Sequence, residues 1–105
     1  MQTHYNKLVR DKIPEIIKAK GETPICRVLQ NTEYLNALNH KLQEEVAEYL
    51  QYNSADELCD ILEVIYAIAM AKGYTVQDLT ITRQAKNEKN GAFDNKIFLE
   101  RVISP

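Results

Sequence analysis

Acidic residues recur at helical spacing in the middle of the chain. Glu44 and Glu45 are followed by Glu48, and Glu57 is followed by Asp60. Residues three apart on a helix lie on one side of it, so each group would place two carboxylates about one turn apart. Like charges repel at that spacing. A hard divalent cation such as Mg2+ would neutralise them, because it prefers oxygen ligands and often bridges carboxylates to phosphates. The pattern therefore predicts a metal-dependent site for phosphate chemistry.

Helices are the elements that would have to position these acids. The turn residues and apolar spacings predict four helices, over residues 11–20, 31–52, 54–72 and 75–90. Asn31 or Thr32 is a candidate cap for the second helix. Ser54 and Glu57 have the S-x-x-E form of a capping box at the start of the third, and Thr75 begins the fourth with a weaker version of that signal.

Two segments outside the helices have extended character. Residues 23–29 are rich in strand-forming side chains and are expected to form a short strand or an extended arm. The tail, residues 93–102, carries scattered apolar residues and would be a second arm, able to pair with the first. The predicted fold is all-α, an antiparallel helical hairpin with a short extended arm or β pair, in a single domain over residues 1–105.

The rotational phase of the acids brings four of them together. With about 100° per residue, Glu45 and Glu48 border the apolar stripe of the second helix, and Glu44 lies further round. On the third helix, Glu57 falls inside the apolar arc and Asp60 at its edge. An acid among apolar residues is unfavourable to bury unless it is paired or metal-bound. Antiparallel packing of the two helices would make the four carboxylates converge.

Simpler explanations exist for each acid. Glu57 fits a capping box, so it could serve only the amides that begin a helix. Glu44, Glu45 and Glu48 could form a solvated face paired with Lys41, as charge runs usually do. Asp60 is harder to explain in this way, because it lies beyond the first turn and beside the core.

Composition excludes several classes of protein. The 105 residues carry a formal net charge of -2, which gives no basic excess for bulk nucleic acid as a partner. The longest apolar-rich run is too short to span a bilayer, and the N-terminus lacks the apolar region of a signal peptide. Cys26 and Cys59 have no metal-type spacing, and reduced thiols fit a cytoplasmic protein.

Basic residues provide candidate contacts for phosphate oxygens. Lys41 lies on the site edge of its helix, and the other candidates form two groups: Lys7, Arg10 and Lys12 near the N-terminus, and Arg83, Lys86 and Lys89 at helical spacing. Phe93 follows a glycine and could stack on a base or belong to the core. Each cation could equally be a solvated surface residue.

The acid motif resembles a known signature. The pattern EExxE followed by ExxD is similar to that of the all-α nucleoside triphosphate pyrophosphohydrolases, a superfamily that includes the MazG-like proteins. The opening segment, residues 5–14, resembles a small MazG-like branch described as phosphoribosyl-ATP pyrophosphohydrolase-like, as do residues 41–45, 60–64 and 89–93. The spacing between Glu48 and Glu57 is shorter than is usual in the superfamily, which leaves less room for a base-recognition insert.

The resemblance implies an activity and a set of roles. Relatives hydrolyse a nucleoside triphosphate between the α and β phosphates, giving a monophosphate and pyrophosphate. Carried onto this chain, Mg2+, or Mn2+ as a substitute, would be bound by four acids: Glu45, Glu48, Glu57 and Asp60. Glu44 would orient or deprotonate the attacking water, with Glu45 as the second catalytic acid. The substrate would be contacted by five side chains: Arg10, Lys41, Lys86, Lys89 and Phe93.

Two further expectations concern assembly and alternatives. The wide apolar arcs of the two central helices are not covered by 105 residues, so we expect a homodimer or homotetramer in which hairpins form four-helix bundles. One alternative function is the phosphoribosyl-ATP pyrophosphohydrolase step of histidine synthesis. Another, of a different class, is a non-catalytic helical interaction module.

Overall fold

The computed structural model covers residues 1–105 and is entirely helical in its regular structure. The helices are α1 (Ile13–Ala19), α2 (Asn31–Tyr52), α3 (Ala55–Ala71) and α4 (Val76–Asn90). All four predicted helices are present, and their ends lie within two residues of the expected ones. The all-α prediction is confirmed.

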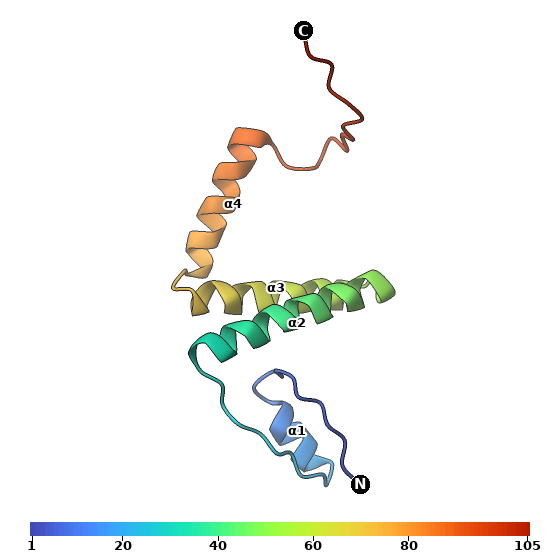
Figure 1. Ribbon diagram of the computed structural model, residues 1–105, viewed down its shortest axis with the longest axis vertical. Coiled ribbons are helices and arrows are strands. Elements are labelled where there is room, and N and C mark those ends of the chain that lie inside the picture. Colours follow the sequence, from blue (N-terminus) through green and yellow to red (C-terminus); the bar gives the residue numbers. More distant parts are fainter.

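An antiparallel hairpin of α2 and α3 forms the body of the molecule, as Figure 1 shows. Only Asn53 and Ser54 connect the two helices. Asn53 adopts a left-handed conformation with φ 55°, and its N–H donates to the Tyr49 carbonyl at 2.7 Å. Asparagine tolerates this conformation better than most residues, so it ends α2 where glycine commonly would. The tight connection forces the two helices to lie side by side.

The core is confined to this hairpin. Leu38 of α2 and Val64 and Ala69 of α3 are the only buried apolar residues of the chain. Among the helices α4 contacts α3 alone, and it turns away from the hairpin after the short connection that follows Gly73 (Figure 1). The single chain therefore packs two helices on each other and leaves much of their apolar surface exposed.

The two ends of the chain are irregular. We refer to residues 5–12, which precede α1, as the N-terminal arm, and to residues 91–105, which follow α4, as the C-terminal arm. No residue of the chain belongs to a strand, so the predicted β pair between residues 23–29 and 93–102 is wrong. A lone extended segment forms no sheet without a partner for its ladder, and Figure 1 places these two segments at opposite ends of the molecule.

Two of the predicted helix caps differ from expectation. Neither Asn31 nor Thr32 caps α2, because Gln30 is the cap residue and it makes no side-chain bond. The Ser54 side chain does not bond the backbone of α3, so the capping box expected there is absent. At α4, Thr75 and Asp78 form the complete capping box, with bonds of 2.9 and 3.0 Å.

None of the helices is long and apolar enough to traverse a lipid bilayer.

Candidate metal and phosphate site

The five acids singled out in the sequence lie at the connected end of the hairpin. Glu44, Glu45 and Glu48 occupy the C-terminal half of α2, and Glu57 and Asp60 occupy the first turns of α3. The antiparallel arrangement brings these two stretches to the same end of the molecule. The field of the α2 acids reaches the N-terminal arm, since Glu44, Glu48 and Glu45 all raise the pKa of Lys7.

Glu45 is the most unusual of these acids. It is only 5% exposed and is the one buried charged residue of the chain. One carboxylate oxygen, Oε1, lies 3.2 Å from the Lys41 Nζ atom, one turn earlier on α2. The other oxygen, Oε2, is buried without a hydrogen-bond partner. An orphaned buried acceptor costs about 1–3 kcal/mol, and more when charged, so this oxygen is a candidate ligand atom.

Glu57, on the neighbouring helix, also has a buried carboxylate oxygen without a hydrogen-bond partner. The Ser54 hydroxyl donates to its Oε2 atom at 2.6 Å, while its Oε1 atom is buried with no partner. The side chain therefore does not serve the amides at the start of α3, which was the simpler explanation for its position. Two buried, unpartnered carboxylate oxygens thus occur on the two helices of the hairpin.

The N-terminal arm supplies two cations to the acids. The Lys7 Nζ atom donates to the Glu44 carboxylate at 2.9 Å, and the Arg10 Nη2 atom donates to Asp60 at 2.7 Å. These ion pairs join residues 37 and 50 positions apart in sequence. One cation contacts α2 and the other α3, so the arm is fastened to both helices of the hairpin. Arg10 therefore lies beside one of the predicted metal ligands, and its role as a substrate contact stays a prediction.

The charges of the site act on one another. The hydrogen bond from Lys7 lowers the pKa of Glu44, and the same bond raises the pKa of Lys7. The Arg10 pKa is raised by its bond to Asp60. The pKa of Glu48 moves the opposite way from that of Glu44: the nearby Glu45 carboxylate raises it by repulsion. Glu48 is therefore an acid that lacks the cation its neighbours have.

The donor set matches a hard cation, although the side chains as placed do not enclose one. All the candidate ligands are carboxylate oxygens, the type that Mg2+ prefers, and two of them are unpartnered. No three Asp, Glu, His or Cys side chains are grouped closely enough to hold a metal ion. Lys7, Arg10 and Lys41 contact the acids instead.

Three predicted substrate contacts lie elsewhere in the single chain. Lys86 and Lys89 are exposed on α4, which contacts α3 only, and Phe93 is 96% exposed on the C-terminal arm. The chain by itself does not bring these residues to the acids. Conversely, the sequence placed Lys7 only within a basic cluster and gave no sign that Ser54 would bond Glu57.

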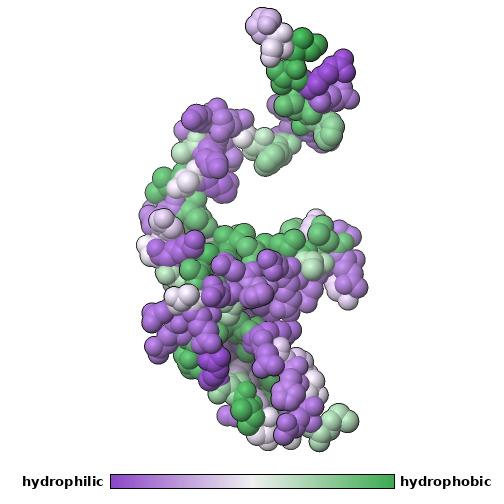
Figure 2. Space-filling model, in the orientation of Figure 1, coloured by the Kyte–Doolittle hydropathy of each residue, from purple (hydrophilic) through white to green (hydrophobic).

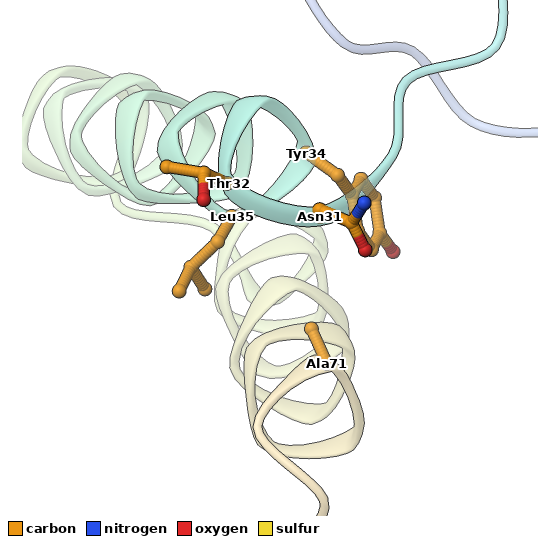
Figure 3. Close-up of a pocket in the computed structure, with 5 residues that line it drawn as sticks. All are labelled: Asn31, Thr32, Tyr34, Leu35 and Ala71. Atoms are coloured by element: carbon orange, nitrogen blue, oxygen red, sulfur yellow. The ribbon is translucent and has the colours of Figure 1, made fainter.

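Two surface hollows of the hairpin include none of these acids. One, shown in Figure 3, lies where the start of α2 meets the end of α3 and is lined by five residues: Asn31, Thr32, Tyr34, Leu35 and Ala71. A second is formed by polar residues of α2: Asn36, Asn39, His40 and Gln43. Neither contains an acid or a strong cation, so neither offers the groups that a metal-bound phosphate requires.

Comparison with known proteins identifies a relative that matches about half of this chain. The chain is 52% identical over 50 residues to an uncharacterized protein from Mycolicibacterium smegmatis. The matched region covers 48% of this chain and 51% of that protein, so the chain spans about half the length of the curated relative it matches. No protein-family model and no solved structure matches the chain.

Proposed function

We propose that this protein is a Mg2+-dependent nucleotide pyrophosphohydrolase that acts in the cytoplasm on nucleoside triphosphates of the nucleotide pool. The observation that carries the proposal is the buried Glu45 carboxylate with one unpartnered oxygen, together with the unpartnered Glu57 oxygen on the adjacent helix. The likeness of the acid motif to the MazG-like superfamily supports the same reading. The working form in this proposal is a homodimer or homotetramer.

The proposed metal ligands are Glu45, Glu48, Glu57 and Asp60. A divalent ion held there would neutralise the triphosphate, stabilise charge in the transition state and lower the pKa of the attacking water. Glu48 contributes because its charge has no cation partner and is repelled by Glu45. In this proposal the Glu45 and Glu57 side chains reorient so that their unpartnered oxygens share one ligand.

The N-terminal arm has a double role in this proposal. Without substrate, Lys7 and Arg10 neutralise Glu44 and Asp60. With a metal-bound triphosphate in place, the same cations exchange carboxylate for phosphate oxygens, which bind Arg strongly in a bidentate geometry. Lys41, which lies between Glu44 and Glu45, is a third phosphate contact on the hairpin.

Movement of the Lys7 ammonium from Glu44 to a substrate phosphate would also make Glu44 a stronger base. The bond from Lys7 keeps the pKa of this acid low, which makes it a poor base. When Lys7 moves to phosphate, the Glu44 pKa rises towards its ordinary value. Glu44 then accepts a proton from the attacking water more readily, so substrate binding and base activation are coupled.

The direct test is to measure pyrophosphate release from a panel of NTPs, dNTPs and phosphoribosyl-ATP, with Mg2+ or with a chelator. We expect Mg2+-dependent release with the monophosphate as the second product, and its loss in the Glu57→Gln variant. Glu63→Gln is the matched control, because Glu63 is an exposed acid on the same helix. Release that persists in chelator, or that is equal in both variants, would refute the metal assignment.

A second candidate is a non-catalytic helical interaction module, and one observation favours it. The ion pairs of Lys7 and Arg10 already satisfy Glu44 and Asp60 without any metal. In that case a calorimetric titration with Mg2+ would give no measurable heat of binding, and the melting temperature of the protein would not change with Mg2+. Activity on phosphoribosyl-ATP alone would instead assign the protein to the related pyrophosphohydrolase of histidine synthesis.

A further inference from the structure

The C-terminal arm is strongly apolar yet contacts nothing apolar in its own chain. Six large apolar side chains fall within eleven residues and are 73–96% exposed: Phe93, Ile97, Phe98, Leu99, Val102 and Ile103. The one backbone hydrogen bond within the arm joins the Lys96 N–H to the Phe93 carbonyl. In Figures 1 and 2 the arm extends away from all four helices and carries hydrophobic surface. Solvated tails are usually poor in such residues, so this composition indicates a segment that becomes buried.

A receiving surface of matching character lies on the hairpin. Val46 and Leu50 are four residues apart on α2, and Leu58 and Leu62 are four apart on α3. Each pair forms a stripe along one side of its helix, and the antiparallel connection at Asn53 and Ser54 sets the two stripes at the same level. These four side chains, the apolar face, are 39–69% exposed.

The apolar face is separate from the candidate metal site. On α2, Glu44 and Glu48 lie two residues before Val46 and Leu50, respectively. Two residues correspond to a rotation of about 200° on a helix, so these two acids lie on roughly the opposite side of α2 from Val46 and Leu50. A segment docked on the apolar face would therefore leave the Lys7 contact with Glu44 undisturbed.

The exposed area of the chain is far larger than a stable monomer of this size would have. The accessible surface is 9785 Å2, whereas a compact 12.1 kDa protein has about 6,000 Å2, an excess of roughly 3,800 Å2. The radius of gyration is 18.8 Å, against about 13 Å for a compact domain of this length. A stable interface needs only about 800 Å2 from each partner, so the excess is ample for one.

We propose that two copies of this chain exchange their C-terminal arms, each arm covering the apolar face of the other copy's hairpin. An extended arm of 15 residues reaches about 50 Å, while α2 is about 33 Å long, so the arm is able to follow the whole hairpin. α4 carries the arm away from its own hairpin (Figure 1). A two-fold exchange buries both arms and closes without further growth, and a net charge of -2 opposes it little.

A single-tryptophan reporter tests the exchange in the full-length protein. The chain has no tryptophan, so Phe98→Trp places the only one on the arm. We expect a dimer mass by light scattering and a blue-shifted emission maximum, both lost together on dilution or in mild denaturant. A solvent-like emission at every concentration would overturn the proposal. So would a blue-shifted emission in a monomer, because the arm would then fold back on its own chain.

Variants of the receiving surface complete the test. In the Phe98→Trp background, Leu62→Asp should give a monomer with solvent-like emission and a retained helical circular dichroism spectrum. Ile81→Asp is the matched control, because it places the same charge at an equally exposed apolar position on α4, and we expect it to change neither mass nor emission. A dimer that persists with blue-shifted emission in Leu62→Asp would show that the arm docks elsewhere and refute the assigned surface.

Discussion

The two arms of the chain differ in whether their side chains find partners within the same chain. The N-terminal arm is polar, and Lys7 and Arg10 fasten it to both helices of the hairpin. The C-terminal arm is apolar, its large side chains are 73–96% exposed, and its backbone extends away from the helices (Figure 1). The single chain thus balances most charges of its candidate site within itself, while leaving its apolar surface without a partner. One copy pairs Glu44 and Asp60 with cations, whereas covering the apolar surface would need two copies.

The largest predicted effect concerns two of the proposed metal ligands, one that the N-terminal arm contacts and one that it does not. Asp60→Asn and Glu48→Gln should each lower Mg2+-dependent pyrophosphate release by at least about 100-fold, because each removes a proposed metal ligand. Their effects on melting temperature should differ in sign. Asp60→Asn breaks the Arg10 ion pair, whereas Glu48→Gln relieves repulsion from Glu45. Unchanged turnover in both variants would contradict the metal site.

The N-terminal arm should respond to metal and substrate, whereas the C-terminal end of α3 should not. Mg2+ or Mn2+ alone competes with Lys7 and Arg10 for the carboxylates, so we expect tryptic cleavage after these two residues to accelerate several-fold. Adding a non-hydrolysable triphosphate should reverse the acceleration, because the cations then bind phosphate. Cleavage after Lys72, the exposed residue that ends α3, is the internal control in the same digest. If cleavage after Lys7 and Arg10 changed with neither metal nor nucleotide, the N-terminal arm would not be part of the site.

The helices and the position of Glu45 beside the core could be predicted from local patterns, whereas the contacts of the N-terminal arm could not. Capping and apolar spacing located every helix within two residues, because these signals act within one or two turns. The rotational phase placed Glu45 beside the core, and the structure buries it. The Lys7 contact with Glu44 joins segments 37 residues apart, and no local pattern reports such a distance. The β pair failed because strand propensity at residues 23–29 says nothing about whether a partner strand lies nearby.

The C-terminal arm should make thermal stability depend on protein concentration. If the arm docks on a second copy, each tenfold rise in concentration should raise the melting temperature by about 3–5 °C through mass action. The Leu99→Asp variant should lose this dependence, while Asn95→Asp, which adds the same charge to a polar position of the arm, should keep it. A melting temperature that is independent of concentration in the unmodified chain would mean that the apolar arm is not an interface between copies.

The smallest predicted effect is the pH dependence of the Lys7 ion pair. The pKa of Glu44 is lowered in the folded chain and that of Lys7 is raised, so the pair stabilises the fold above the unfolded Glu pKa of about 4.3 and below the unfolded Lys pKa of about 10.4. The stability is lost as pH falls through the folded Glu44 pKa. Because Lys7 is 42% exposed, Lys7→Met should lower the free energy of unfolding at pH 7 by at most about 1 kcal/mol.

The Glu48→Gln variant should change the stability at pH 7 in the opposite direction from Lys7→Met. The Glu48 pKa is raised, so its protonated form favours the fold at low pH and its charge disfavours it as pH rises through the folded value. In urea titrations at pH 7, 5 and 3, Lys7→Met should therefore be less stable than the unmodified chain at pH 7, and Glu48→Gln more stable. Both differences should shrink towards pH 3, where carboxylate charge is lost. Differences of the same sign at pH 7 would show that the N-terminal arm does not balance the acids in the way the ion pairs indicate.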